Sequence, residues 1–139
     1  MTVKYFTVEE ANRTLPLVKR IVADIVEDYR VWKERVARYE VYAAAATEAE
    51  TADQRDVRMD VERLAERINT YMEELDAVGC VFKGFDEGLV DFYGRLDGRD
   101  VLWCWKLGEP EVEYWHEVDA GVAGRQPLER SRVGGEDAQ

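Results

Sequence analysis

Histidine, cysteine and proline are scarce in this chain, and each shortage narrows the function classes that remain. Among 139 residues there are one histidine, two cysteines and three prolines. Two cysteines are too few for a disulfide-stapled scaffold and fit reduced thiols, so we expect a cytoplasmic location. A single histidine excludes a metal site built from several histidines of one chain.

Long apolar runs and basic stripes are missing as well. No stretch reaches the ~18 apolar residues of a membrane span, and the N-terminus, already polar over Thr7 to Arg13, lacks a signal-peptide pattern. The formal net charge is −11, and both halves of the chain are acidic. Because an acidic chain repels phosphates and anionic lipid, we expect neither nucleic acid nor a membrane among its partners.

The first residues predict a helix start. Thr7 is placed to cap the free amides, and Glu10, three residues on, can return a hydrogen bond to the amide of the cap. We expect this first helix to be short, because Pro16 disfavours helical geometry at Leu15 and suits the first turn of a second helix.

Two stretches carry apolar side chains at alternating steps of four and three, the heptad spacing of helices that pack side by side. The first comprises Val18, Val22, Ile25, Tyr29, Trp32, Val36 and Tyr39, and the second comprises Val57, Val61, Leu64, Ile68, Tyr71, Leu75 and Val78. Segment 43–53 between them has little apolar bulk, and Thr47, Thr51 and Asp53 in it offer turn or cap chemistry.

Together, residues 1–79 predict a short helix followed by a long antiparallel helical hairpin, coiled-coil-like in pattern, that ends at Gly79 as a C-cap. The longer arm spans about 50 Å at ~1.5 Å per residue. The remainder of the chain is too small to cover a helix of this length. We therefore expect part of its seam to pair with a second copy, forming a dimer.

Beyond Gly79 the pattern alternates and glycine recurs, which predicts an antiparallel β-meander over residues 80–128, packed on the base of the hairpin. Residues 80–86 add a possible edge strand, and residues 129–139 read as a disordered tail. The fold class is α+β. Asp97-Gly98 is the pattern of a type I′ turn and pairs Asp91 with Cys104.

A four-residue loop at 107–110 would set the next register, pairing Trp103 with Tyr114 and Cys104 with Glu113. Alternation then assigns each side chain to a face. One face is nearly all apolar: Val90, Phe92, Gly94, Val101, Trp103, Trp105, Val112, Tyr114 and His116. The other is wetter: Asp91, Tyr93, Arg95, Asp100, Leu102, Cys104, Glu113, Trp115 and Glu117.

A set of short motifs is distributed along the chain. They are Tyr5-Phe6-Thr7, Glu10-Ala11-Asn12, Leu15-Pro16, Gly88-Leu89-Val90-Asp91-Phe92, Gly98-Arg99, Cys104-Trp105, Gly108-Glu109, Trp115-His116 and Gly124-Arg125-Gln126-Pro127-Leu128. On these motifs, about residues 3–128 of the chain resemble a bacterial family of unknown function, number 2203 in the series of domains of unknown function. This resemblance supports the boundaries given above and implies no particular reaction, cofactor or catalytic residue.

The wetter face predicts a docking surface. Its aromatic row of Tyr93, Leu102 and Trp115 has an apolar anchor inside a charged rim, which is typical of interfaces. The rim residues are Asp91, Glu113, Glu117 and Arg125. We expect a non-catalytic module without a cofactor that self-associates through the hairpin and binds an unidentified protein or small ligand here. In the alternative interpretation, the C-terminal tail or segment 119–128 folds back over the row.

A second interpretation is an enzyme or metal-dependent protein. Its site would draw on Cys104, Glu109, Glu113, His116, Glu117 and Arg125. Cysteine, histidine and carboxylates can bind zinc, but this register points Cys104 and His116 to opposite faces. We therefore expect His116 to be a core histidine, bonded to a carboxylate or a carbonyl beside the space left by Gly94, and Cys104 not to act as a nucleophile.

Two further charged groupings have a structural explanation that we favour. Asp91 and Glu113 would lie about 10 Å apart at the usual strand spacing, within the range of paired glycosidase acids, but solvated surface carboxylates are common. Arg99 and Arg125 are expected to form ion pairs with Glu109, Glu117 or Asp119.

Overall fold

The computed structural model describes residues 3–45 and 49–129. These form two helices, α1 (Val8–Ala45) and α2 (Ala52–Val78), followed by a five-stranded sheet. The strands are β1 (Val81–Gly84), β2 (Leu89–Leu96), β3 (Arg99–Lys106), β4 (Tyr114–Glu117) and β5 (Gln126–Pro127), with a 3-10 helix η1 (Val122–Gly124) before β5. The predicted α+β class is confirmed. The centre of the helix reversal (46–48) and the predicted tail from residue 130 onward lie outside the described residues.

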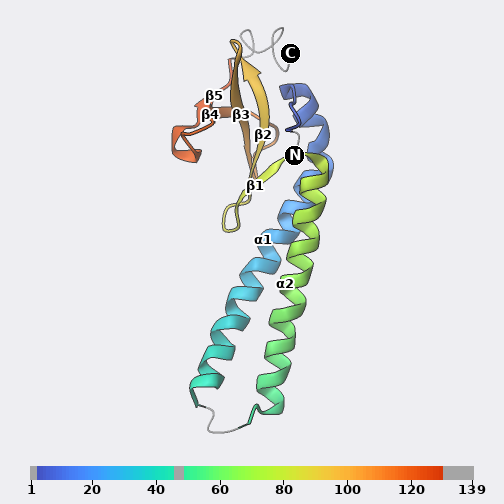
Figure 1. Cartoon of the computed structure of the whole chain (residues 1–139), viewed down its shortest axis with the longest axis vertical. Coiled ribbons are helices and arrows are strands. Elements are labelled where there is room, and N and C mark those ends of the chain that lie inside the picture. Colours follow the sequence, from blue (N-terminus) through green and yellow to red (C-terminus); the bar gives the residue numbers. More distant parts are fainter. Residues whose placement is uncertain (1–2, 46–48, 130–139) are drawn as a thin grey trace.

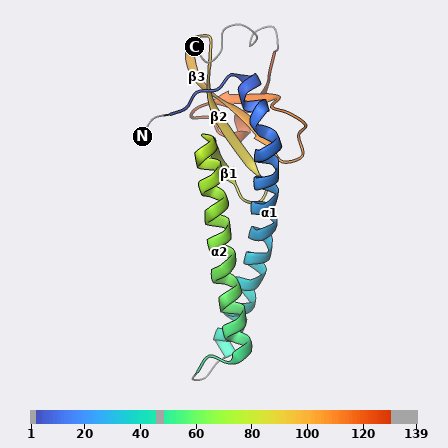
Figure 2. The same cartoon turned by 90° about the vertical axis from the view of Figure 1, so that its right-hand side faces the viewer.

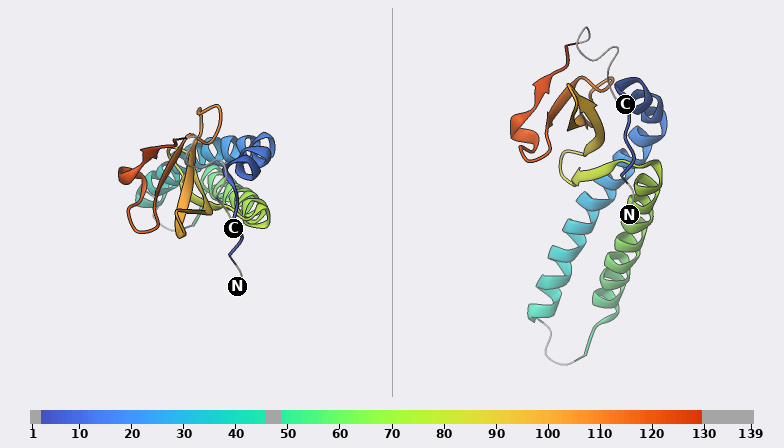
Figure 3. Two further views of the ribbon diagram at one scale, coloured as in Figure 1. Left: turned by 90° about the horizontal axis from the view of Figure 1, so that it is seen from above. Right: turned by 45° about the horizontal axis from the view of Figure 1, so that its top comes forward.

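The two helices form the predicted antiparallel hairpin. They run side by side, and the sheet packs near the end where α1 begins and α2 ends (Figure 1 and Figure 2). The opposite end of the hairpin projects away from the sheet, as the tilted view in Figure 3 shows. Neither helix combines the length and the apolar character that crossing a membrane requires.

Helix α1 begins as predicted but continues where a break was expected. The amide of Glu10 donates to Thr7 Oγ1 at 2.9 Å, and the amide of Thr7 donates to Glu10 Oε1 at 2.8 Å, which completes the capping box. Pro16 lies inside α1, so the prediction of a separate short helix is wrong. Leu15 and Val18 on either side are buried, and about 2 kcal/mol from each offsets the roughly 3 kcal/mol that an internal proline costs.

Helix α2 has both of its predicted ends. Thr51 caps the first turn through a reciprocal box with Gln54, and Gly79 ends the helix in the left-handed conformation with φ of 105°. Every residue of the two predicted heptad seams is buried or half-buried. The seams therefore face the interior of the hairpin and the sheet.

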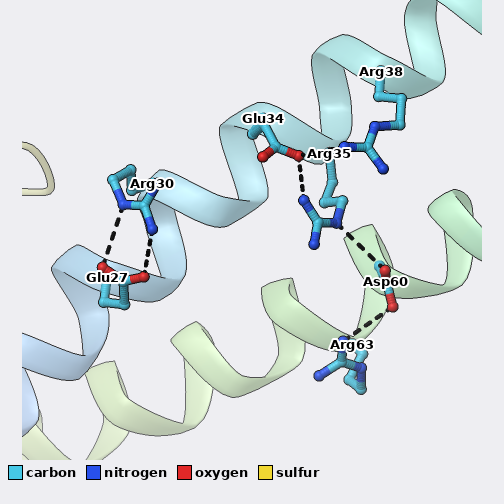
Figure 4. Close-up of polar contacts among 7 residues, drawn as sticks. All are labelled: Glu27, Arg30, Glu34, Arg35, Arg38, Asp60 and Arg63. Carbon is cyan, nitrogen blue, oxygen red and sulfur yellow. Dashed lines mark hydrogen bonds and ion pairs between the residues drawn. The ribbon is translucent and has the colours of Figure 1, made fainter.

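Ion pairs join the helices along their outer faces. Arg35 Nε on α1 lies 3.5 Å from Asp60 Oδ2 on α2, and Asp60 also binds Arg63 of its own helix (Figure 4). Nearer the sheet, Arg67 of α2 lies 3.0 Å from the buried carboxylate of Asp28 on α1. The exposed pairs each contribute little, on the order of 0–1 kcal/mol, so the apolar seam dominates hairpin stability.

The sheet is an antiparallel meander in the order β1-β2-β3-β4-β5. At the β2–β3 turn both central residues have positive φ, 54° at Asp97 and 79° at Gly98, as a type I′ turn requires. The predicted pairing of Asp91 with Cys104 is confirmed, and residues 81–84 supply the expected edge strand β1.

The β3–β4 register differs from the prediction by one residue. Trp103 pairs with Trp115, not Tyr114, and Cys104 pairs with Tyr114, not Glu113. The connection between β3 and β4 spans residues 107–113 and is longer than the expected four-residue loop. Contacts with residues outside these two strands hold it in place. The amide of Val112 donates to Asn12 Oδ1 of α1 at 2.7 Å. A shift of one residue moves every β4 side chain to the opposite face.

The apolar face of the sheet packs against the helices around a deeply buried indole. A Cβ at Gly94 would lie 2.0 Å from Trp103 Nε1, so only glycine leaves room for the ring. That Nε1 donates to the carbonyl of Phe6 at 2.8 Å and ties the start of the chain to the sheet. The space beside Gly94 is therefore filled by Trp103, and the prediction that His116 lies there is wrong.

Candidate functional site

Three buried side chains meet on the second face of the sheet. Asp91 of β2, Cys104 of β3 and His116 of β4 are each at most 2% exposed, and one ligand-type atom of each lies within 4.8 Å of the others. Asp91 is the direct cross-strand partner of Cys104, and His116 pairs with Leu102, diagonal to Cys104. The expectation that Cys104 and His116 point to opposite faces is therefore wrong.

The hydrogen bonds of His116 fix the orientation of its ring. Nδ1 lies 2.7 Å from the carbonyl oxygen of Glu117, and a carbonyl only accepts, so Nδ1 carries a proton. In a neutral imidazole this leaves a lone pair on Nε2, which faces Asp91 Oδ1 at 3.2 Å. Two acceptors face each other there, so a shared proton or a cation must lie between them. A backbone carbonyl on Nδ1 is also the usual support of a histidine that binds metal through Nε2.

Cys104 is protonated when no cation is bound. Burial raises the pKa of its thiol to about 11, the charge of Asp91 acts in the same direction, and Arg125 acts against both. The basic Nε2 of His116 is directed at Asp91, and Nδ1 is bound to a carbonyl. This is not the chain of thiol, imidazole and carboxylate that activates a nucleophilic cysteine.

Arg125 supports Cys104 from the segment that precedes β5. Its Nη2 donates to the carbonyl of Cys104 at 3.3 Å and to Glu109 Oε1 at 2.7 Å, so one of the predicted ion pairs is confirmed. The guanidinium lies over the Tyr114 ring at 4.1 Å, and its Nε is buried without an acceptor among the described residues. A thiolate at Cys104 would be stabilised by this cation.

A cavity of about 200 Å³ opens directly onto the three side chains. Apart from Asp91, Cys104 and His116, it is lined by Lys83, Leu89, Val118, Gly121 and Val122. The cluster is therefore not sealed inside the core. It forms the polar end of a pocket whose other walls are mostly aliphatic.

The predicted docking row is not formed. Trp115 is 6% exposed and lies on the core face beside Trp103, and Arg99 covers its ring at 5.8 Å. Leu102 is buried on the opposite face, and only Tyr93 of the row is half-buried. The exposed aromatic surface predicted around Trp115 is therefore absent from the described residues.

The remaining predicted site residues are dispersed. Glu113 is exposed in the β3–β4 connection and does not face Cys104, so it forms no acid pair with Asp91 across the sheet. Glu117 binds Arg99 at 2.6 Å, which confirms the second expected ion pair, and its carbonyl holds His116. Glu109 forms an ion pair with Arg125, the residue that supports Cys104.

One signal in the sequence favours the observed register over the predicted one. The predicted register surrounds the only histidine with Gly94 and Val101, neither of which offers it a side-chain hydrogen bond. The shifted register brings His116 to Asp91 and buries Trp115. Buried polar groups are almost always paired, so this criterion separates the two alternatives.

The fold and the buried cluster define an α+β protein in which a helical hairpin supports a meander with a polar pocket. Residues 4–128 match the family model described as an uncharacterized conserved protein (DUF2203), and the chain belongs to that family. No curated protein and no solved structure matches the chain.

Proposed function

We propose that this protein binds one divalent metal ion of the zinc class through Asp91, Cys104 and His116, leaving one coordination position open toward the cavity. The proposal is carried by three buried ligand-type atoms within 4.8 Å of one another. Sulfur, imidazole nitrogen and carboxylate oxygen are the ligands that zinc prefers, and three protein ligands with an open fourth position are typical of catalytic zinc sites.

The distances between the three ligand atoms suit such an ion after a small contraction of the cluster. At zinc–ligand distances of about 2.0–2.3 Å, tetrahedral ligand atoms lie roughly 3.3–3.8 Å apart. The Nε2 of His116 and Oδ1 of Asp91 are already 3.2 Å apart. Displacement of the Cys104 proton by the ion would also give the buried Arg125 guanidinium a negatively charged neighbour.

A core ion pair between Asp91 and His116 is the simplest alternative. It accounts for the 3.2 Å contact, but it explains neither the buried thiol within reach of both groups nor the cavity beside them. The metal proposal accounts for all three features with one ion.

Zinc titration followed by calorimetry tests the proposal. We expect one equivalent to bind to the wild-type protein, and Cys104→Ser, His116→Gln and Asp91→Asn each to weaken binding by at least about tenfold, in line with the loss of a ligand. Cys80→Ser and Glu113→Gln are matched controls, because Cys80 is the other buried thiol and Glu113 is an exposed acid near β4. Equal zinc affinity in Cys104→Ser and Cys80→Ser would contradict the proposal.

Self-association through the hairpin stays a separate proposal. Val41 and Met59, 68% and 55% exposed, lie near the end of α1 and near the beginning of α2, on the side of the helix reversal. Against it, the heptad seams of the two helices already pack within one chain. Sedimentation at micromolar concentration distinguishes a dimer, which we would expect to weaken in Met59→Glu, from a monomer.

A cytoplasmic location is proposed from the two free thiols, since a thiolate ligand requires reduced cysteine. The acidic net charge of −11 supports the proposal that nucleic acid is not a partner.

A further inference from the structure

We infer that the cavity binds a short aliphatic carboxylate, whose charged end completes the metal coordination and pairs with Lys83 while its chain lies against Val118 and Val122. This inference rests on the metal site proposed above and names the class of ligand for its open position. It draws on the cationic wall, the aliphatic walls and the charge balance of the cavity.

The cationic wall is the side chain of Lys83 on the edge strand β1. Val81 pairs with Asp91, so β1 lies directly beside the strand that carries this proposed metal ligand. The register shifts between Phe82 and Gly84, which marks a bulge at Lys83, and bulges redirect side chains. Lys83 lines the cavity, and no ion pair of Lys83 is formed within residues 3–45 and 49–129.

The aliphatic walls are Leu89, Val118 and Val122. Val118 and Val122 are 47% and 45% exposed, although both are large aliphatic residues. The apolar segment of a ligand would cover exposed aliphatic side chains of this kind at the border of a polar pocket.

The charge balance favours a monoanion. A divalent ion bound by two anionic ligands, the Asp91 carboxylate and the Cys104 thiolate, forms a neutral centre, and Lys83 adds one positive charge. Arg125 is already paired with Glu109 at 2.7 Å. One carboxylate neutralises the cavity, whereas a phosphate dianion would leave an excess negative charge beside a buried carboxylate in an acidic protein.

The volume limits the length of the ligand. The cavity of about 200 Å³ corresponds to roughly six or seven water volumes, at about 30 Å³ each. A branched acid such as 3-methylbutanoate, with seven non-hydrogen atoms, is therefore close to the largest ligand expected.

The test uses the full chain loaded with zinc and three probes: acetate, 3-methylbutanoate and inorganic phosphate. We expect 3-methylbutanoate to bind more tightly than acetate, by up to about fourfold for each buried methylene, and phosphate to bind at least tenfold more weakly. The neutral amide of the same acid should not bind measurably. Tighter binding of phosphate, or equal affinity for the amide, would overturn the inference.

Lys83→Met supplies the variant, and Lys4→Met, an exposed lysine outside the cavity, supplies the charge-matched control. We expect Lys83→Met to raise the dissociation constant for 3-methylbutanoate at least tenfold while changing zinc affinity by less than about threefold. Lys4→Met should change neither. If zinc binds but the carboxylate binds equally to all three proteins or to none, this inference fails and the metal site stands. If zinc does not bind, both are overturned.

Discussion

His116 Nε2 lies 3.2 Å from Asp91 Oδ1, although the two residues occupy strands that are not neighbours. Strand β3 runs between them, and the sulfur of its Cys104 lies within 4.8 Å of both groups. The arrangement depends on the β3–β4 register, because a shift of one residue would return His116 to the core face.

The contact between Asp91 and His116 predicts energetic coupling in metal-free protein. We expect Asp91→Asn and His116→Gln each to lower the free energy of unfolding by about 1–3 kcal/mol, because each leaves a buried polar group without its charged partner. The double variant should cost less than the sum, with a coupling of at least about 1 kcal/mol by urea denaturation in chelator.

Arg99 and Glu117 provide the control for that cycle. This pair is closer, at 2.6 Å, but its side chains are 50% and 36% exposed. Its coupling should stay below about 0.5 kcal/mol. Coupling between Asp91 and His116 no larger than this control value would show that the buried contact is not formed.

The buried position of Trp115 predicts a large loss of stability when its ring is removed. Trp115→Ala should lower the free energy of unfolding by about 3–5 kcal/mol, since the ring is nearly inaccessible and the substitution leaves a large cavity. Tyr93→Ala, a half-buried aromatic on the other face, should cost distinctly less. Urea denaturation of the two variants checks this, and a neutral Trp115→Ala would restore the idea of an exposed docking surface.

Gly94 is predicted to tolerate no side chain. A Cβ there would lie 2.0 Å from Trp103 Nε1, so Gly94→Ala should displace the indole, break its bond to Phe6 and destabilise the domain by at least about 3 kcal/mol. Gly84→Ala is the matched control, because its Cβ would approach only the flexible end of Leu89, at 3.3 Å. Similar thermal stability of the two variants would contradict the packing described for Trp103.

Both thiols are predicted to react slowly in the folded, metal-free protein. Burial raises the pKa of Cys80 to about 12 and that of Cys104 to about 11. At pH 8 the thiolate fraction of Cys104 is then at least about a hundredfold below that of a free cysteine, and Cys80 lies lower still. Mass spectrometry after iodoacetamide treatment should show labelling only in denaturant. Rapid alkylation of native Cys104 would revive a catalytic interpretation of that thiol.

Much of the fold follows from patterns local in sequence. The Thr7–Glu10 box, the Gly79 cap and the Asp97-Gly98 turn each act over a few residues, so the helix ends and the β2–β3 register could be predicted. The hairpin followed from two heptad seams of matching period. The predicted break at Pro16 was wrong, because tertiary packing buries the neighbouring residues and keeps the helix continuous.

The candidate site could be predicted only in part. The pairing of Asp91 with Cys104 follows from the local turn, whereas the position of His116 depends on a connection held by Asn12 from α1 and by Glu109 with Arg125. Those contacts join residues far apart in the chain, and turn preferences carry no information about them. A loop-length error of this kind reverses the face of a whole strand.

The absorption spectrum of the cobalt-substituted protein tests the central claim most directly. Cobalt(II) takes zinc-type sites, and a cysteine thiolate bound to it gives an intense charge-transfer band in the near ultraviolet. We predict that this band saturates at one equivalent in the wild-type protein and in Cys80→Ser, and is lost in a folded Cys104→Ser variant. No band in the wild type, or an undiminished band in Cys104→Ser, would contradict a metal site formed by Asp91, Cys104 and His116.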